Sequence, residues 1–184
     1  MRDTLIYIAG RPASGKTTLM ASLTRDYARR TVDCGPVGFD ELWLPAHDDC
    51  TGIEIGARKG KGEYSGTDAL PATSIGLGVK WIETVPSRLV LAEGARFSNR
   101  RFFAAARRGR YNMVYVLLAH PQITEWEDAR AKRTGRIPNP DFSDRRARSD
   151  WAVSEQLKAW GAAVFVGHPD EVEEPLRQLI ALYE

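Results

Sequence analysis

Four residues near the N-terminus have the types and spacing of a phosphate-binding turn. They fit the pattern G-x-x-x-x-G-K-[ST] and are Gly10, Gly15, Lys16 and Thr17. An apolar run precedes this turn and a helical pattern follows it, which is the context that such a turn requires. The glycines allow backbone N–H groups to surround a phosphate, and the start of the helix adds partial positive charge. The segment predicts a P-loop in which Lys16 is catalytic and bridges the terminal phosphates as a point charge.

The same turn predicts a site for ATP and Mg²⁺. We expect the nucleotide to contact the whole segment Gly10, Arg11, Pro12, Ala13, Ser14, Gly15, Lys16, Thr17 and Thr18. The Thr17 hydroxyl can bind the metal, and a second ligand is expected from Glu93, which ends the apolar run "LVLAEG". A carboxylate at that position can hold Mg²⁺ through water or orient an attacking group. The alternative is an acidic residue that merely ends a strand.

A phosphoryl transfer to a hydroxyl group also needs a base. Asp40, in "VGFDELW", is expected at the end of the second strand, where it would face the γ-phosphate and accept the proton. Asp68, in "YSGTDALP", is a second candidate for this role. Each aspartate can instead cap a turn or a helix. We take Asp40 as the candidate base and keep Asp68 as its rival.

A basic segment follows these motifs and predicts a lid. Residues 96–148 carry 13 Lys/Arg and 5 Asp/Glu, a net charge of +8, whereas the rest of the chain carries −6. We expect a lid at about residues 122–150, in which Arg130 and Arg133 stabilise the transferring phosphoryl group. Arg145 and Arg148 share one helical face and are further candidates. The alternative for each arginine is a solvated surface position.

The elements that position these residues alternate along the chain, which predicts an α/β fold. We expect strands at 4–9, 32–39, 88–92, 111–118 and 162–166, and helices at 17–29, 74–85, 98–108, 122–133, from 143 and from 169. Residues 45–66 have no periodicity and are expected to form a long loop. Strands that alternate with helices indicate a parallel sheet covered on both faces. The prediction is a single P-loop NTPase domain over residues 1–184, with about five parallel strands.

The composition is that of an ordinary globular chain. It has 184 residues, of which 43% are hydrophobic and 27% charged. Its apolar runs are much shorter than the roughly 20 residues that span a bilayer, so no membrane partner is expected. We expect a cytoplasmic location. Cys34 and Cys50 have no metal-binding spacing, and the oligomeric state has no signature in the sequence.

His168, in "HPD", follows the last expected strand. The loop that contains it can pass the base of a nucleotide, so His168 can stack on adenine. The alternative is that it begins the helix in which Pro169 is the first residue.

Three stretches together resemble phage P-loop kinases of the nucleotide-kinase-like group. They are "GRPASGKTT", "GTDALP" and "EGARFSNRRF". More narrowly, they resemble enzymes that phosphorylate hydroxymethyluracil in DNA, and more distantly polynucleotide kinase. The resemblance implies Mg·ATP as donor, DNA as acceptor and, for a phage protein, the host cytoplasm as location. The basic segment would then contact DNA phosphates, and Phe97, Phe102 or Phe103 would stack on an extruded base, with a place in the core as the alternative.

We therefore expect an ATP-dependent kinase that acts on a hydroxyl group, most specifically that of hydroxymethyluracil in phage DNA. Two alternatives remain open. One is a kinase of a free nucleoside, a nucleoside monophosphate or another small metabolite. The other is a binding or switch protein that hydrolyses ATP.

Overall fold

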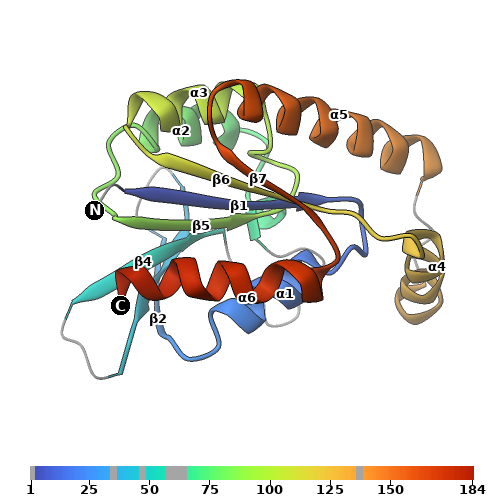
Figure 1. The fold of residues 1–184 in the computed structure, drawn as a ribbon, viewed down its shortest axis with the longest axis horizontal. Coiled ribbons are helices and arrows are strands. Elements are labelled where there is room, and N and C mark those ends of the chain that lie inside the picture. The colour runs from blue at the N-terminus through green and yellow to red at the C-terminus, as the bar shows by residue number, and fades with distance from the viewer. Residues whose placement is uncertain (1–2, 34–36, 46–48, 57–65, 136–138) are drawn as a thin grey trace.

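Alternating strands and helices form one sheet with helices on both faces (Figure 1). The computed structural model describes residues 3–33, 37–45, 49–56, 66–135 and 139–184, and for residues 133 and 134 it describes the backbone alone. In this part of the chain, the strands are β1 (Thr4–Gly10), β2 (Ala28–Val32), β3 (Phe39–Trp43), β4 (Cys50–Ile55), β5 (Leu89–Glu93), β6 (Asn112–Leu118) and β7 (Ala163–Gly167). They are arranged in the order β2-β3-β4-β5-β1-β6-β7.

The expected parallel sheet is confirmed and carries two additional strands. Strand β4 pairs in parallel with β5, β5 with β1, β1 with β6, and β6 with β7. Strands β2 and β3 are antiparallel and extend the sheet beyond β4. The described sheet therefore has seven strands rather than five. The carboxyl ends of its parallel strands share one edge, where ligands bind in folds of this type.

Six helices of the described residues cover the two faces of the sheet and one of its edges. They are α1 (Lys16–Leu23), α2 (Ser74–Trp81), α3 (Arg100–Arg108), α4 (Ile123–Thr134), α5 (Pro140–Ala159) and α6 (Pro169–Ile180), with short 3₁₀ turns η1 (Gly66–Ala69) and η2 (Ala181–Tyr183). Figure 1 shows α2, α3 and α5 on one face, α1 and α6 on the other, and α4 beyond the sheet edge. Among the helices described, none is long and apolar enough to cross a membrane.

Strand β1 shows how the sequence produces this layered core. All seven of its residues are buried, because helices cover both of its faces. Leu5, Tyr7 and Ala9 belong to the apolar layer under α2, α3 and α5, and Ile6 and Ile8 to the layer under α1 and α6. This separation follows from the alternation of side chains along a strand. Burial on both faces explains the continuous apolar run in the sequence.

The first helix is shorter than expected and ends at Leu23 rather than near Arg29. The hydroxyl of Thr24 donates to the carbonyl of Met20 at 2.7 Å, which satisfies the last turn. Residues 28–32 then form β2, antiparallel to β3. The predicted strand at 32–39 is wrong, since this region separates β2 from β3 instead of forming one strand.

The expected loop at 45–66 contains β4, the outermost of the parallel strands, which joins them to antiparallel β3. Gly52 lies within it, and a Cβ atom at this position would be 2.9 Å from the carbonyl oxygen of Leu89 in β5. The glycine permits close approach of two strands here and does not mark a turn. The start of the fifth helix was also predicted wrongly, since Asn139 caps α5 and Ser143 is buried within it.

Candidate active site

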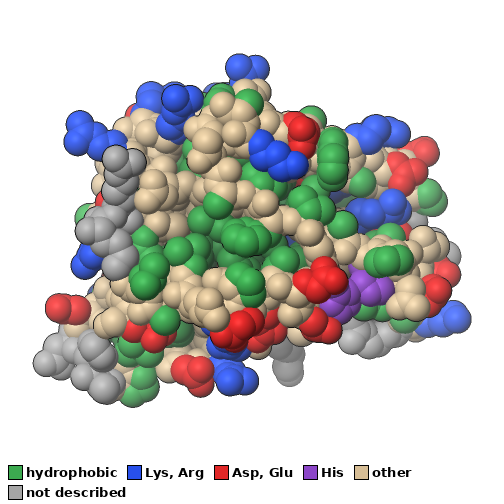
Figure 2. All heavy atoms as spheres, viewed as in Figure 1, with side chains coloured by type: hydrophobic (Ala, Val, Ile, Leu, Met, Phe, Trp, Pro, Cys, Tyr) green, Lys and Arg blue, Asp and Glu red, His purple; other side chains and the backbone are tan. Residues whose placement is uncertain are grey.

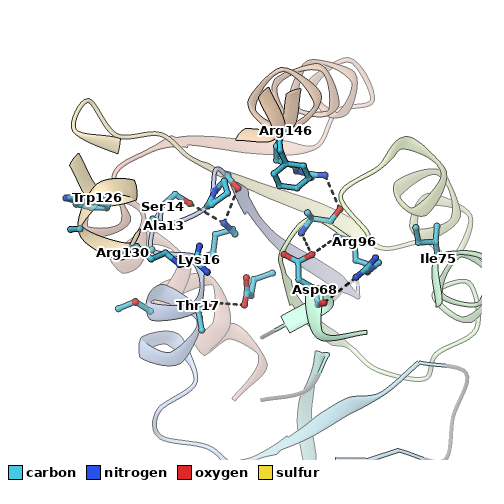
Figure 3. Close-up of a pocket in the computed structure, with 18 residues that line it drawn as sticks. Ala13, Ser14, Lys16, Thr17, Asp68, Ile75, Arg96, Trp126, Arg130 and Arg146 are labelled. Carbon is cyan, nitrogen blue, oxygen red and sulfur yellow. Dashed lines mark hydrogen bonds between the residues drawn. The ribbon is translucent and has the colours of Figure 1, made fainter. Parts of the chain in front are cut away.

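A pocket of about 1110 Å³ lies at the carboxyl edge of the sheet (Figure 3). The turn between β1 and α1 forms one side of this pocket. Residues from η1, the end of β5, α4 and α5 form the remainder, among them Asp68, Glu93, Arg130 and Arg146. The structure therefore brings most of the predicted site residues into one cavity.

The turn that follows β1 has the backbone shape of a phosphate cradle. The φ angles at Gly10, Ala13 and Gly15 are 143°, 65° and 89°, which place all three outside the usual regions for L-residues. A Cβ atom at Gly10 would lie 2.8 Å from both the Leu118 carbonyl oxygen and the Ser14 hydroxyl oxygen. Successive turns of this kind aim N–H groups into a concave, anion-binding surface. The cradle fits the phosphates of a nucleotide.

Lys16 lies across the mouth of this cradle. Its Nζ donates to the carbonyl oxygens of Gly10 at 3.0 Å and of Arg11 at 2.7 Å. Burial lowers the pKa of the Lys16 ammonium, while the negative charges of Glu93 and Asp68 oppose that shift. The ammonium group is thus held beside the position where phosphate charge would accumulate.

Thr17 and Glu93, the two residues that the sequence suggested as magnesium ligands, are hydrogen-bonded to each other in the pocket. The Thr17 hydroxyl donates to Glu93 Oε1 at 3.0 Å, and Glu93 is 3% exposed at the end of β5. A hydroxyl and a carboxylate are hard oxygen ligands, which Mg²⁺ prefers. These two side chains fit the Mg²⁺ ion that accompanies a nucleoside triphosphate.

Asp68 lies in the pocket, whereas Asp40 does not. The Oδ1 atom of Asp68 accepts from the backbone N–H groups of Ala95 at 2.8 Å and Arg96 at 3.0 Å. Asp40 is 5% exposed and accepts from Arg29 at 3.1 Å and from the Thr31 hydroxyl at 2.8 Å. It is absent from the described residues that line the pocket.

The placement of Asp40 thus corrects the sequence-based choice of base. Asp40 lies near the start of antiparallel β3, opposite Glu54 of β4, and both oxygens of its carboxylate accept from side chains of β2, those of Arg29 and Thr31. Asp68 follows β4, which is parallel to β5 and directs its carboxyl end to the edge of the sheet that holds the pocket. Their partners therefore distinguish the two aspartates, since Asp40 is bound to strand β2 and Asp68 lines the pocket.

Three arginines line the pocket, and only one of them was predicted. Arg130 of α4 lies near enough to Lys16 for its charge to contribute to the lowered pKa of the lysine. Arg96 and Arg146 are the two that the sequence-based reasoning missed. Arg146 pairs with buried Asp150, and this spacing of four residues on a helix is a signal that the sequence does contain. The side chain of Arg133 lies outside the described residues.

A family model described as P-loop Nucleotide Kinase3 matches residues 1–181. The chain belongs to the P-loop Nucleotide Kinase3 family. Comparisons with curated proteins and with solved structures give no match. Membership in this family supports a nucleotide-kinase-like protein that transfers phosphoryl groups from ATP, in agreement with the cradle and the side chains around it.

Three rings gather beside the nucleotide site of this P-loop kinase. His120 follows β6, His168 follows β7, and Trp126 is on α4. The ring centroids of His120 and Trp126 are 4.0 Å apart, and those of His120 and His168 are 4.5 Å apart. Pro169 contacts the cradle, since a Cβ atom at Gly15 would lie 3.0 Å from it. His168 also caps α6, so its expected role at a helix start is confirmed.

The phenylalanines expected to stack on a base are core residues in this kinase fold. Phe97 and Phe102 are 0% exposed and Phe103 is 1% exposed. Phe97 and Phe102 stack on each other at 4.9 Å, and Phe103 packs edge-on against Tyr7 and Tyr115. Their place in the core excludes stacking on a ligand base in this conformation.

Proposed function

We propose that this chain transfers the γ-phosphoryl group of Mg·ATP to a hydroxyl group, most specifically that of hydroxymethyluracil in DNA. The observation that carries the proposal is the presence of Asp68 in the same pocket as Lys16 and the Thr17–Glu93 pair. A hydrolase needs only to position water, whereas a kinase needs a base beside a site for an organic acceptor. The family match supports the kinase reaction.

The nucleotide side of the reaction uses the cradle, the Lys16 ammonium group, Mg²⁺ and the lid arginines. Backbone N–H groups of the turn after Pro12, which itself has none, bind the phosphates, and Lys16 exchanges its carbonyl partners for phosphate oxygens. Thr17 and Glu93 hold Mg²⁺, which supplies neutralisation of phosphate charge when it is bound. Arg130, from a lid at about residues 122–150, stabilises charge on the transferring group, and Arg133 is the second lid arginine proposed for this role.

On the acceptor side, Asp68 accepts the proton of the attacking hydroxyl group. Its Oδ1 atom is held by two backbone N–H groups, and no described residue donates to its Oδ2 atom. Oδ2 is thus the oxygen that takes the proton. The acceptor oxygen forms a bond to the γ-phosphorus as the bond from that phosphorus to the β–γ bridging oxygen breaks, which leaves ADP.

The three-ring cluster of His120, Trp126 and His168 serves the adenine base in this proposal. It stands on the side of the cradle away from Asp68, next to the start of α6 (Figure 3 shows Trp126 and Asp68 on opposite sides of Lys16). Both imidazoles accept a backbone N–H at Nδ1, from Gln122 and Asp170. In the neutral ring this leaves a proton on Nε2, a donor suited to the ring nitrogens of a purine.

The case for DNA as the acceptor rests on charge and on the resemblance in sequence. Lys and Arg side chains gather over α3, and over α5 they lie among Asp and Glu side chains (Figure 2). The exposed arginines of these two helices are Arg100, Arg101, Arg107, Arg108, Arg145 and Arg148. These exposed arginines favour a polyanionic substrate.

Radiolabelled ATP and a panel of acceptors test this proposal. We expect transfer of label to hydroxymethyluracil-containing DNA and none to unmodified DNA, with Lys16→Met as the inactive control. Label found only in free nucleosides, nucleoside monophosphates or other small acceptors would replace DNA by a metabolite as acceptor. Phosphate release at the same rate with and without any acceptor would identify an ATP-hydrolysing switch protein.

A further inference from the structure

The arginine of the phosphate-binding turn makes its contacts with the lid. The Nε and one terminal nitrogen of Arg11 donate to the two carboxylate oxygens of Glu127, each at 3.2 Å. The other terminal nitrogen donates to Asp144 at 3.0 Å. Glu127 belongs to α4 and Asp144 to α5, so one side chain of the turn joins both lid helices.

The contact with Glu127 is the stronger of the two on physical grounds. The Glu127 side chain is 10% exposed and the Asp144 side chain 55% exposed. A two-pronged Arg–carboxylate pair has one geometry, which orients both partners, and it is little weakened by solvent where it is buried. Removing Arg11 would leave Glu127 as a buried, unpaired charge, whereas Arg11 without Glu127 would keep its contact with Asp144.

Glu127 lies among the three described residues of α4 that line the pocket, which are Trp126, Ala129 and Arg130. Trp126 is the residue before it, and Arg130 is three residues after it on neighbouring positions of the helix surface. If the position of Glu127 is fixed relative to the turn, the rotation of α4 is fixed as well. The ring of Trp126 and the charge of Arg130 are then presented to the nucleotide site.

We infer that Arg11 and Glu127 form a positioning pair that holds α4 in register over the phosphate-binding turn. The inference rests on the proposed phosphotransfer and gives Arg11 a role different from the phosphate contact that its sequence position predicts. Arg11 acts through α4, and Glu127 is as necessary as Arg11. Together they order the lid side of the nucleotide site before the nucleotide arrives.

A double-mutant cycle separates this role from a direct phosphate contact. The variants are Arg11→Met, Glu127→Gln and the two combined. The measurements are the affinity for Mg²⁺ with a non-hydrolysable ATP analogue, by calorimetry, and hydrogen exchange of the α4 amides without nucleotide. We expect each single variant to weaken binding on the order of tenfold and to accelerate exchange in α4, and the double variant to be no worse than either.

A direct phosphate contact by Arg11 gives the opposite pattern. Glu127→Gln would then leave binding unchanged or tighten it, because it removes a negative charge near the phosphates, and α4 exchange would stay at the wild-type rate. That result, or additive losses in the double variant, would overturn the inference. Asp128→Asn is the matched control, since it makes the same charge change at the next, exposed residue of α4, and we expect no effect from it.

A further variant and the wild-type control complete this experiment. Arg11→Lys keeps the charge but cannot form two parallel bonds, so we expect α4 exchange between that of the wild type and that of Arg11→Met. An unchanged exchange rate in all folded variants would exclude the pair. A wild-type chain that binds no ATP analogue would contradict the proposed function, while the exchange data without nucleotide would still decide whether Arg11 and Glu127 hold α4.

Discussion

At the scale of single residues, Asp40 and Asp68 show how surroundings assign a role to one type of side chain. Asp40 is bonded on both oxygens, to Arg29 and Thr31, within an antiparallel strand. Asp68 is anchored through one oxygen and lines the nucleotide pocket. An ion-paired, buried carboxylate stabilises the fold, whereas one that lines a pocket is placed to exchange a proton with a ligand.

The two aspartates should respond differently to the same substitution. Asp68→Asn is expected to lower kcat by about 10²- to 10⁴-fold with little change in affinity for the ATP analogue, because it removes the base. Asp40→Asn is expected to retain kcat but to lower the free energy of unfolding by about 1–3 kcal/mol, because Arg29 loses a charged partner. Steady-state kinetics and urea unfolding measure both effects. A loss of kcat in Asp40→Asn with normal Asp68→Asn activity would return the base to Asp40.

Trp126 allows a separate test of base stacking. Trp126→Leu is expected to weaken binding of the ATP analogue by about 1–3 kcal/mol, the usual contribution of a base stacked on an aromatic ring. Inorganic tripolyphosphate has no base, so its affinity should be unchanged. Calorimetry with both ligands checks the prediction, and an equal loss for the two would mean that Trp126 acts on the phosphate side.

At the scale of elements, β4 determines where the acceptor side of the pocket lies. Strand β4 is followed in the chain by residues 57–65, which are not among the residues that the structure describes, and then by η1 with Asp68. Its pairing with β5 depends on close approach at Gly52, where no side chain stands between the strands. The position of Asp68 therefore depends on Gly52, which is not among the described residues that line the pocket.

Two glycines test this dependence. Gly52→Ala is expected to destabilise the protein by about 1–3 kcal/mol, because the added methyl group meets the Leu89 backbone at 2.9 Å. Gly76→Ala makes the same chemical change in α2. A Cβ atom at this position would have no described atom within 4 Å outside its own helix, so the substitution should stabilise the protein by about 0.5–1 kcal/mol. Urea unfolding midpoints measure both. Equal effects of the two substitutions would show that helix and strand propensity, rather than close approach, governs Gly52.

At the scale of the whole molecule, charge is divided between two sides. The layer of α3 and α5 carries exposed arginines, and the side of α6 carries many carboxylates (Figure 2). Such a division leaves the net charge near +2 but gives one face a positive potential. The basic face adjoins α5 residues of the pocket, Phe142 and Arg146.

Salt dependence measures whether DNA uses this face. For single-stranded DNA, the logarithm of the binding constant should fall linearly with the logarithm of salt concentration, by about 0.7 per phosphate contacted. Combining Arg145→Ala with Arg148→Ala should reduce that slope by roughly one contact for each arginine, across all sequences. Arg25→Ala, which removes an exposed arginine beyond the end of α1, is the control and should leave the slope unchanged. Identical slopes in all variants would exclude α5 as the DNA-binding face.

The sequence by itself determined the parts of this protein that depend on neighbouring residues. The phosphate-binding turn, with Lys16 and Thr17, was predictable because its geometry is local and its glycines are needed at set spacings. Strand β1 and most helices were predictable because burial imposes a period on the sequence. Glu93 was predictable because it ends such a strand.

Only the tertiary structure decided which distant residues meet. The pairing of strands placed Asp40 beside Arg29 and Thr31 of β2 and left Asp68 in the pocket, and pairing order is not encoded in local spacing. The presence of β4 in a stretch rich in glycine, and the attachment of Arg11 to Glu127 across 116 positions, likewise depend on packing. The physical reason is that an ion pair or a strand pair is selected by burial and geometry in the folded chain, which no short window of sequence contains.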